Sequence, residues 1–528
     1  MAALDPHSPP PAPAEPEPAE APGGNARWRW LNARPWPFHP VLLAAYFVLF
    51  LYSVNLEEAE FADVLPVLIP VVGVTAGLLV VGGLVVRDIR RAAIVLSAVV
   101  VALLAYGHLS RLLAPIRIGT GFQQVGWALL VLLAVLFIWR AGRWIPQLTR
   151  ILNVAAVALI LVPIVTIIPN QAGRIAAPAG PAPAASPTTG TPSAEQPDIY
   201  WFIFDRYPSA SSSRLAYGIE NPIFDELRSR GFYVADRSHA NYQQTTLSLK
   251  STFSAEFLDG RGHADIFGPT DQSGVYTRIQ NSNIARFLKA QGYYYVHVGS
   301  DFSPTRTSPL ADVNHAYDNF SDFGTAFIES TAMPAIARRL GILASPHQRR
   351  YDWTTWELKL LENLPRYPSP AFVFGHVMLP HTPYIFDSEG RLVSESANRG
   401  RSHKEQFAEQ LEFTNTRLLA ILDRLLDVPA AERPLIIVQA DEGPYPPDLE
   451  DETGHDWTTA TPEEREIKYG ILNAWYIPDG RDIGLYPEIT PVNTFRLLFN
   501  AYFDTDLPLL PDESYSLTHP EPLVFPEP

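Results

Sequence analysis

The strongest constraint on the fold of this chain is a series of five apolar stretches within its first 170 residues, each nearly free of charge. A helix needs ~20 apolar residues to cross the hydrocarbon core of a bilayer, and several of the stretches approach that length. A helical core buried inside a soluble domain is the alternative, but repeated uncharged stretches with short connections are more typical of membrane spans. We therefore expect five transmembrane helices, at residues 40–54, 64–86, 92–109, 125–139 and 151–169.

The placement of arginine indicates the orientation of these spans. Arginines cluster before the first span, between the second and third, and between the fourth and fifth, whereas residues 57–60 after the first span read Glu-Glu-Ala-Glu. Because cytoplasmic loops are enriched in Arg and Lys, the N-terminus is expected in the cytoplasm, and five crossings place the rest of the chain outside. Arg111 and Arg117 weaken this pattern without reversing it. The clustered arginines are Arg27, Arg29, Arg34, Arg87, Arg90, Arg91, Arg140, Arg143 and Arg150.

Composition divides the chain into four regions. Residues 1–37, which are rich in Pro, Ala and Glu near their start, are expected to form a disordered cytoplasmic tail without a cleavable signal peptide. Five transmembrane helices follow within residues 38–169. Residues 170–197, rich in Pro, Ala, Ser and Thr, indicate a flexible linker. Residues 198–528 then form an extracytoplasmic domain of a multi-pass protein of the cell membrane.

The charge of the chain is also unevenly distributed. Residues 1–196 contain 10 acidic and 12 basic residues, so residues 197–528 carry a net charge of −18 within a total of −16. Such acidity argues against a nucleic-acid partner, which requires clustered Lys and Arg, and suits a solvated surface or a cation site. The chain has no cysteine, which excludes disulfides and thiolate metal sites.

Apolar strand candidates alternate with helical patterns beyond the linker. This alternation predicts an α/β domain with a mostly parallel sheet and helices on both faces. In such sheets, ligands bind beyond the carboxyl ends of the strands. The expected strands are 199–204, 293–298, 371–377, 435–439 and 471–477, and the expected helices are 222–230, 245–257, 283–291, 404–426 and 492–502.

Polar residues at strand ends are the candidates for chemistry. Asp205 follows the first strand of the domain, and Asp441-Glu442-Gly443 follows the strand at 435–439. A single carboxylate at a strand end is as often a cap for the next helix, but two in one sheet favour a cation site. His381 stands between two prolines in the loop after the strand at 371–377, and such a stiff loop is not typical of a core histidine. Asp, Glu and His at one rim are a metal-site composition.

The order of these motifs resembles the alkaline phosphatase/sulfatase superfamily. The motifs are Asp205, the segment Asn-Tyr-Gln-Gln-Thr-Thr-Leu-Ser at 241–248, Pro-His-Thr-Pro at 380–383, and Asp441-Glu442-Gly443. The chain looks most like the membrane-anchored branch, which comprises sulfatase-like proteins, phosphoethanolamine transferases and lipoteichoic acid synthases, with five spans before an extracytoplasmic catalytic domain. Residues 468–474 and 491–496 look like the sulfatase-like subgroup, so the resemblance covers nearly the whole chain after the tail.

The resemblance implies a catalytic hydroxyl at a helix N-terminus, where Thr245 matches, although Thr246 or Ser248 could take this role and a plain helix cap is the alternative. His381 would match a histidine that contacts the transferred group or its leaving oxygen, and His455 lies near the position of another active-site histidine. His376 inside the strand could equally be a core residue, whereas Lys250 and Arg206 are expected to be structural. The implied metal ligands are Asp205, Thr245, Asp441 and Glu442.

Two departures from the family pattern limit the chemistry. No Ser/Cys-x-Pro-x-Arg sequence surrounds Thr245 and the chain has no cysteine, so the formylglycine of true sulfatases cannot form. Glu442 stands where the family usually has histidine. The resulting oxygen-rich ligand set favours Mn²⁺, Mg²⁺ or Ca²⁺ over Zn²⁺, or else marks a decayed site.

We therefore predict a membrane-anchored, metal-dependent, sulfatase-like hydrolase or transferase that acts on phosphate esters of lipid-linked or cell-envelope substrates. Thr245 would attack phosphorus, and His381 or His455 would assist the leaving group. Its partners would be a membrane lipid or an envelope glycan or polymer. The alternative is a non-catalytic envelope binding protein on the same fold. A transporter is disfavoured, because the spans lack buried charges that could line a path.

Overall fold

The structure of the protein is a computed structural model. It describes residues 35–56, 61–107, 110, 120–140, 142–176, 196–258, 278–317, 322–340, 344–447, 449 and 457–515. The expected tail up to residue 34, residues 177–195 of the expected linker, and His455 lie outside the described residues.

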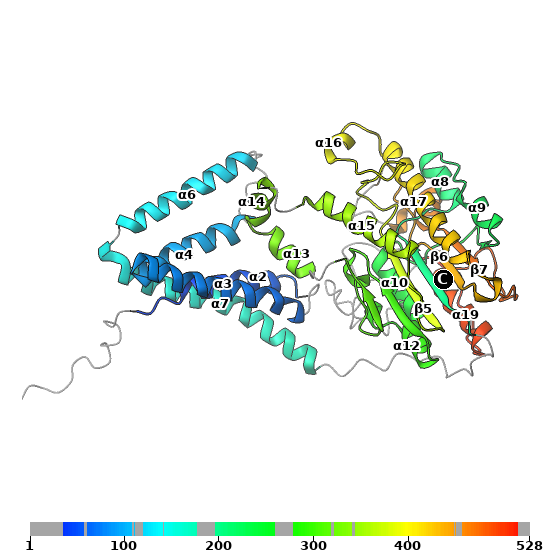
Figure 1. The fold of residues 1–528 in the computed structure, drawn as a ribbon, viewed down its shortest axis with the longest axis horizontal. Coiled ribbons are helices and arrows are strands. Elements are labelled where there is room, and N and C mark those ends of the chain that lie inside the picture. The colour runs from blue at the N-terminus through cyan, green and yellow to red at the C-terminus, as the bar shows by residue number, and fades with distance from the viewer. Residues whose placement is uncertain are drawn as a thin grey trace, which may run out of the picture.

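Five helices occupy the positions of the five expected spans (Figure 1). Two of them contain segments long and apolar enough to cross a membrane, Asp63–Val86 and Gly142–Ala172, and only 17% and 22% of their most apolar windows is buried. Crossing by the other three stays a prediction. The last helix continues into the expected linker, where Gln171 donates a 2.8 Å hydrogen bond to the Tyr52 hydroxyl. The helices are α2 (His39–Ser53), α3 (Phe61–Val86), α4 (Ile89–Leu104), α6 (Thr120–Arg140) and α7 (Ile145–Ala176).

A seven-stranded sheet with the order β2-β7-β6-β1-β5-β3-β4 forms the centre of the C-terminal domain. The central strand β1 pairs in parallel with β5 on one side and with β6 on the other. The expected parallel pairing continues through β3 and β4, but β7 and β2 run antiparallel at the opposite edge, so the sheet is mixed. The strands are β1 (Ile199–Phe204), β2 (Tyr233–Val234), β3 (Tyr294–Val298), β4 (Val313–His315), β5 (Ala371–Val377), β6 (Leu435–Gln439) and β7 (Asn473–Tyr476).

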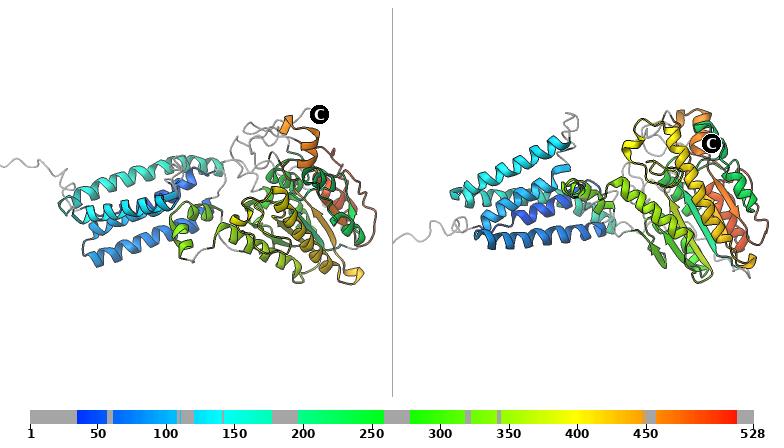
Figure 2. Two further views of the ribbon diagram at one scale, coloured as in Figure 1. Left: turned by 90° about the horizontal axis from the view of Figure 1, so that it is seen from above. Right: turned by 45° about the horizontal axis from the view of Figure 1, so that its top comes forward.

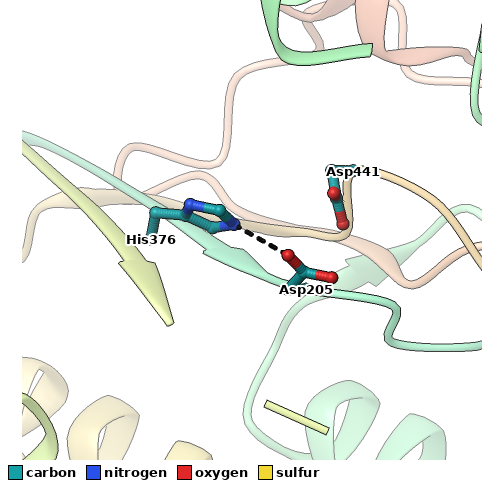
Figure 3. Close-up of side chains that lie close together, drawn as sticks. All are labelled: Asp205, His376 and Asp441. Atoms are coloured by element: carbon teal, nitrogen blue, oxygen red, sulfur yellow. Dashed lines mark ion pairs between the residues drawn. The ribbon is translucent and has the colours of Figure 1, made fainter. Parts of the chain in front are cut away.

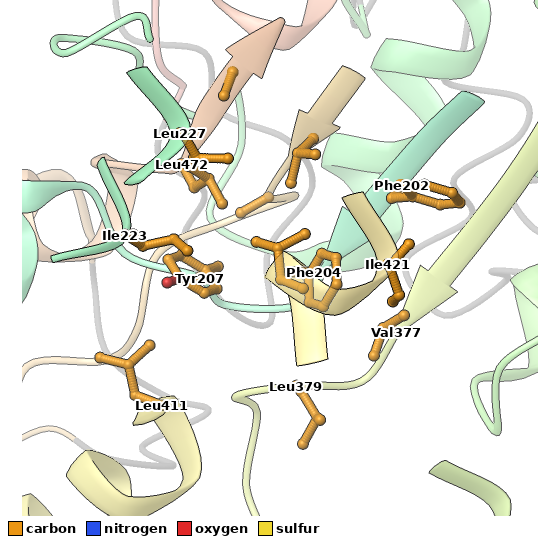
Figure 4. Packing of buried hydrophobic residues seen from close by; sticks show 14 of the residues in the cluster. Phe202, Phe204, Tyr207, Ile223, Leu227, Val377, Leu379, Leu411, Ile421 and Leu472 are labelled. Carbon is orange, nitrogen blue, oxygen red and sulfur yellow. The ribbon is translucent and has the colours of Figure 1, made fainter. Parts of the chain in front are cut away.

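Helices cover both faces of this sheet, because successive side chains of a strand point to opposite faces. Phe202 and Phe204 of β1 belong to one core, with residues of α9, α15 and α17 (Figure 4). Trp201 and Ile203 belong to the other core, with residues of α10, α12 and α19. The covering helices are α9 (Ile223–Ser229), α10 (Thr245–Ser254), α12 (Asn283–Ala290), α15 (Pro346–Glu362), α17 (His403–Leu426) and α19 (Thr494–Tyr502).

Several elements differ from the sequence expectation. The bounds of β1, β5 and β6 are those expected, whereas the pattern did not reveal α15, β2 or β4. Helix α15 is polar on average, and its buried face includes the polar residues Thr354 and Glu357 beside Trp353, Leu358 and Leu361. Its apolar periodicity is therefore incomplete. Strands β2 and β4 have two and three residues, too few for an alternation to be recognised. The other short helices are α8 (Ala210–Tyr217), α13 (Asp322–Glu329), α14 (Met333–Arg339), α16 (Glu395–Asn398) and α18 (Pro462–Tyr469).

Helix α13 leaves the α/β domain and packs on the N-terminal helices, and α14 follows it (Figure 2). Phe323 and Phe327 of α13 join an apolar cluster that includes Tyr52 of α2. Ala332 also donates a backbone hydrogen bond of 2.8 Å to the carbonyl of Leu103, at the end of α4. The two halves of the chain are therefore joined by packing as well as by the linker.

Candidate active site

The three central strands bring two aspartates and a histidine to one rim of the sheet. Asp205 follows β1 directly, and Asp441 follows β6 by one residue. His376, the penultimate residue of β5, is aligned with Ile203 of β1. One ligand atom from each of Asp205, His376 and Asp441 lies within 4.8 Å of the others, and all three residues are buried (Figure 3). The three residues therefore form one small cluster, because each lies at or near the end of a strand and the three strands are neighbours in the sheet.

The polar atoms of this cluster are poorly satisfied by the protein. Both carboxylate oxygens of Asp205, Oδ2 of Asp441 and Nε2 of His376 are buried without a hydrogen-bond partner among the described residues. His376 Nε2 lies 3.5 Å from Asp205 Oδ2, beyond hydrogen-bond distance. Buried polar groups are normally paired, and buried charges are normally balanced by a counter-charge or a metal. The donor set therefore fits a divalent cation coordinated by two carboxylates and one imidazole.

Mutual repulsion shapes the protonation of the two aspartates. Burial, with the nearby charges of Asp205 and Glu442, raises the pKa of Asp441 well above its usual value. Burial also opposes ionisation of Asp205, but His381, His376 and Arg206 surround its carboxyl group and lower its pKa below the usual range. Two carboxylates held this closely repel each other when both are ionised, and a cation between them would remove this repulsion.

A chain of buried polar groups on the Nδ1 side of the imidazole fixes the orientation of His376. Thr305 Oγ1 lies 2.8 Å from His376 Nδ1, and it also lies 3.4 Å from the carbonyl of Phe302, to which it can donate. Thr305 Oγ1 also lies 2.9 Å from Ser300 Oγ, so it can either accept from His376 Nδ1–H or donate to Nδ1. In the tautomer that carries Nδ1–H, the Nε2 lone pair would be directed at the aspartates. The carbonyl of Thr305 in turn accepts a 2.7 Å hydrogen bond from His297, whose pKa burial lowers to about 4.

Thr245 is the first residue of α10, and its side chain is close enough to the Asp441 carboxyl group to counteract in part the rise in the pKa of that group. No side chain caps this N-terminus, because Gln244 at the cap position makes no side-chain hydrogen bond to the helix. Amide groups of a first turn that lacks a side-chain cap can bind an anion. Ser248, one turn later, donates a 2.6 Å hydrogen bond to the Asp441 carbonyl and so joins α10 to the end of β6.

The loop after β5 brings His381 to the same rim. The carbonyls of Pro380 and His381 accept hydrogen bonds from Gln410 of α17 at 3.2 and 3.0 Å, which hold the loop in place. Nδ1 of His381 hydrogen-bonds to the carbonyl of Thr382, so the neutral ring presents its Nε2 lone pair. Burial lowers the pKa of His381 to about 3, so the ring is neutral at physiological pH.

Glu442 is directed towards two cations. Its Oε1 lies 3.0 Å from Arg206 Nε and 3.0 Å from Lys468 Nζ, and both cations contact the ring of Tyr445. Arg206 adopts a positive φ of 57°, and its backbone N–H donates to Asp441 Oδ1 at 3.1 Å. The next residue, Gly443, admits no side chain, because a Cβ there would lie 2.4 Å from the Ile467 carbonyl.

The structure thus brings together most of the site residues expected from the sequence. Asp205, Asp441, Thr245 and His381 meet at one rim, while Glu442 lies next to it with its Oε1 bound to cations, and its role as a ligand stays a prediction. Ser248 is buried behind Asp441, whereas Thr246 is half-buried at the start of α10. Lys250 is buried within α10, and Arg206 pairs with Glu442.

His376 is the residue that the sequence left undecided. A histidine in a fully buried strand needs a polar partner. The sequence placed carboxylates at the ends of two other strands, but it did not show which of these strands lies beside β5. The position of β5 beside β1 was the missing information. With it, His376 could have been assigned to the rim that carries Asp205.

No protein-family model matches this chain, and no curated protein matches its sequence. Solved structures do resemble it. The C-terminal periplasmic domain of EcEptC from Escherichia coli, in complex with Zn, has a TM-score of 0.39 and 12% identity over 59% of this chain and 83% of that chain. The integral membrane lipooligosaccharide phosphoethanolamine transferase A from Neisseria meningitidis has a TM-score of 0.36 and 11% identity over 83% and 87%.

A 2-O GAG sulfatase has a TM-score of 0.38 and 13% identity over 60% of this chain and 72% of that chain. At such identities, and with TM-scores below 0.5, similarity transfers neither site residues, nor a metal, nor a substrate to this chain. The solved structures to which the chain is similar are phosphoethanolamine transferases and sulfatases, which belong to the alkaline phosphatase/sulfatase superfamily with its membrane-anchored branch.

Proposed function

We propose that this protein is a metal-dependent hydrolase or transferase that acts on phosphate esters of lipid-linked or envelope substrates. The observation that carries this proposal is the buried cluster of Asp205, His376 and Asp441, whose unpartnered atoms converge beside the hydroxyl of Thr245. An unpaired cluster of this kind is costly to maintain, which favours a functional over a purely structural role.

Thr245 is the proposed nucleophile. When bound, a divalent cation supplies positive charge that favours the threonine alkoxide and the charge developing on the phosphoryl oxygens. The Thr245 hydroxyl lies next to Asp441, whose carboxylate would be the first acceptor of its proton. Its Oγ forms a bond to phosphorus as the bond from phosphorus to the leaving oxygen breaks, and that oxygen takes a proton from solvent. The N-terminal amides of α10 face the same phosphoryl group.

His381 is suited to the second half of the reaction. Its neutral ring presents Nε2 as a proton acceptor, because Nδ1–H is engaged by the Thr382 carbonyl. Nε2 would accept a proton from the water or acceptor alcohol that attacks the phosphothreonine. The new bond to phosphorus forms as the bond to Thr245 Oγ breaks, and the threonine recovers a proton. Water would make the protein a hydrolase, and an alcohol would make it a transferase.

The N-terminal helices support a location in the cell membrane. Phe122, Val85 and Val154 are 81%, 76% and 71% exposed, on α6, α3 and α7. Apolar side chains exposed along several helices would be covered by lipid tails. With the arginine pattern, we infer five crossings and an extracytoplasmic α/β domain. ATP is absent there, which favours a substrate that brings its own phosphate ester.

Metal analysis and a phosphodiester assay on the purified full chain test this proposal. We expect about one equivalent of divalent metal and hydrolysis of bis(p-nitrophenyl) phosphate that a chelator abolishes. Thr245→Ala should lower the rate by at least about 100-fold, a typical loss for a nucleophile, while retaining the fold. Thr246→Ala is the matched control, because its hydroxyl lies one residue further along α10, and its rate should stay within about threefold of the wild type.

The alternative is a non-catalytic binding protein, which the pairing of Glu442 with Arg206 and Lys468 favours. A protein purified without metal, and unable to take it up on dialysis, would support this alternative. Full activity of Thr245→Ala would exclude the proposed nucleophile while leaving a metal-dependent enzyme possible.

A further inference from the structure

Helix α14 carries a patch of exposed apolar side chains. Met333, Ile336 and Leu340 are 51%, 47% and 68% exposed. They are spaced by three and four residues, so they share one face of the helix. Six large hydrophobic side chains are exposed in the described part of the α/β domain, and half of them lie on this one short helix. An apolar face concentrated in this way marks a surface that a partner protein or a membrane covers.

The start of α14 is bound to the end of α4, beside which it lies in Figure 1. The backbone N–H of Ala332 donates to the carbonyl of Leu103 at 2.8 Å, and that of Gly107 donates to the carbonyl of Ser330 at 2.9 Å. A side chain at position 107 would prevent this approach, because a Cβ there would lie 2.3 Å from the Ser330 carbonyl oxygen. The two hydrogen bonds therefore fix the position of α14 along the axis of α4.

The end of α4 that holds α14 is the extracytoplasmic end in the expected topology. Helix α4 follows the arginine-rich connection at residues 87–91, so the arginine pattern places its C-terminus outside. Trp127 of α6 donates a 2.6 Å hydrogen bond to the carbonyl of Ala102, next to Leu103. Tryptophan indoles are enriched at the boundary between lipid chains and headgroups. Helix α14 therefore begins at the depth expected for the extracytoplasmic membrane interface.

The contacts of α13 indicate the same depth. Phe323 and Phe327 belong to a cluster with Tyr52 at the end of α2, Val64 near the start of α3 and Ile167 in the last third of α7. In the expected topology, α2 and α7 cross outward and α3 crosses inward, so all three of these positions are extracytoplasmic. Helices α13 and α14 thus lie at one end of the proposed spans.

The segment around α14 is basic within an acidic domain. Residues 330–351 contain four arginines and no aspartate or glutamate, whereas residues 197–528 as a whole carry a net charge of −18. Arginines beside an apolar helix face are typical of a helix that lies in the plane of a membrane interface. A bilayer supplies both an apolar layer and phosphate groups at this depth, which matches both parts of the segment.

We propose that α14 lies in the extracytoplasmic interface of the membrane. Met333, Ile336 and Leu340 face the upper part of the lipid chains, and the arginines of residues 330–351 lie near the phosphate groups. The partner is the bilayer as a surface, and no individual lipid is bound as a substrate. This contact holds the catalytic domain at a fixed distance from the membrane, which a flexible linker alone would not do. The inference goes beyond the proposed catalysis and depends only on the proposed location in the membrane.

A single label on α14 tests the inference, and the absence of cysteine from the chain makes such a label possible. Ile336→Cys is labelled with the fluorophore NBD, and the full chain is placed in nanodiscs of phosphatidylcholine and phosphatidylglycerol. The quenchers are iodide in the water and a lipid with a nitroxide just below its headgroup. The apolar face of an interfacial helix lies ~5–10 Å below the headgroup boundary, so the nitroxide lipid should quench this label at least about threefold more than a label remote from the membrane.

Two other single labels are the controls. Leu215→Cys is the matched control, because Leu215 is similarly exposed but lies on α8, at the end of the molecule away from the N-terminal helices (Figure 1). Its label should respond to iodide and not to the nitroxide lipid. Leu133→Cys tests the membrane location itself, because Leu133 is exposed in the middle of the proposed span α6. Its label should be quenched most by a lipid with the nitroxide near the end of its chain.

A charge on the apolar face should displace α14 from the lipid. Leu340→Asp, introduced into the Ile336→Cys chain, should raise the quenching by iodide at least about twofold, because a carboxylate is costly to place among lipid chains. Leu340→Met keeps an apolar side chain of similar volume and should leave the quenching unchanged. Equal thermal unfolding of the two variants in detergent excludes a folding defect, and equal quenching by iodide would overturn the inference.

The labels separate the position of α14 from the location of the whole protein. Iodide quenching at position 336 with lipid quenching at position 133 would overturn the inference and leave the spans intact. Loss of lipid quenching at both positions would overturn the membrane location as well. A label at position 336 that neither quencher reaches would mean that protein, such as a second copy of this chain, covers the face, and this would also overturn the inference. The metal analysis and the phosphodiester assay test the proposed catalysis independently of these outcomes.

Discussion

Two clusters of charged residues lie side by side at the rim of the sheet, and they differ in how their charges are balanced. In the first cluster, Asp205, His376 and Asp441 converge with carboxylate and imidazole atoms that lack partners. In the second, Glu442 contacts the cations of Arg206 and Lys468 at 3.0 Å each. The second cluster is paired with cations of the protein itself, whereas the unpartnered atoms of the first could hold a metal ion.

The contrast is sharpest between Asp441 and Glu442, which are adjacent in the sequence and both nearly fully buried. Burial lowers the pKa of Lys468 to about 8, but a charged lysine remains the main form at neutral pH beside Glu442. These adjacent acids therefore differ in their contacts: Asp441 Oδ2 has no hydrogen-bond partner among the described residues, whereas Glu442 Oε1 contacts two cations and only its Oε2 has none. Residue type alone does not reveal which acid binds metal.

The largest expected effect is a difference between Asp441 and Glu442 in their contributions to metal affinity and to the free energy of unfolding. Asp441→Asn should weaken metal binding by more than the ~10–100-fold typical for loss of an outer-shell partner, because it removes a charged ligand. Glu442→Gln should change metal affinity by less than about 10-fold, yet lower the free energy of unfolding by about 3–5 kcal/mol, because two buried cations lose their counter-charge. Competition with a fluorescent chelator gives the affinity, and denaturant unfolding gives the stability.

Each variant is the control for the other, since both replace one buried carboxylate by an amide of the same shape. Equal loss of metal in the two variants would show that Glu442 is a ligand, as expected from the resemblance, and would remove the distinction between the clusters. Loss of stability without loss of metal in Asp441→Asn would assign the opposite roles.

The next largest expected effect concerns Thr305, which contacts His376 of the first cluster. Thr305→Val removes the hydroxyl that lies 2.8 Å from His376 Nδ1 and keeps the branched shape of the side chain. We expect metal affinity to fall ~10–100-fold, the usual effect of losing a partner that orients a histidine ligand. Isotope-edited NMR of the imidazole nitrogens should show that His376 loses its fixed tautomer.

Thr305→Ser is the matched control, because it keeps the hydroxyl and should retain metal affinity within about threefold. Unchanged affinity in Thr305→Val would mean that His376 is a satisfied core histidine and that the first cluster consists of aspartates alone.

The sequence predicted which strand ends bring polar side chains to one rim of the sheet, but not how these side chains are paired. Asp205, Asp441 and His381 were recognisable because each follows an apolar strand, and chain order is enough to locate such a residue. Pairing depends on contacts between distant segments, such as Lys468 with Glu442, which no local pattern encodes. His376 became interpretable only when β5 was placed beside β1.

The same limit applies to the connection between the halves of the chain. The apolar stretches predicted five helices, and their bounds agree with the structure within a few residues except for the longer α7. The return of α13 to the N-terminal helices was not predicted, because an eight-residue helix with two phenylalanines, Phe323 and Phe327, is equally consistent with burial in its own domain. Only the fold shows which surface these rings cover.

The smallest expected effect concerns a third buried acid, Glu357 of α15, which has neither the cations of Glu442 nor the ligand cluster of Asp441. Its Oε1 lacks a hydrogen-bond partner among the described residues. Burial, followed by the charge of Asp301, raises the pKa of Glu357 well above its usual value. The folded state therefore holds this proton over a pH range in which the unfolded chain, with a pKa near ~4.3, has released it. Stability should fall as pH rises through that range, by up to ~1.4 kcal/mol per pH unit.

Glu357→Gln should remove this dependence, because glutamine is neutral at every pH. The midpoint of thermal unfolding, measured for the full chain between pH 5 and pH 8, should decline less in the variant than in the wild type. Glu412→Gln, at an exposed position of α17, is the control and should decline as the wild type does. An equal decline in Glu357→Gln would mean that Glu357 ionises normally in spite of its burial.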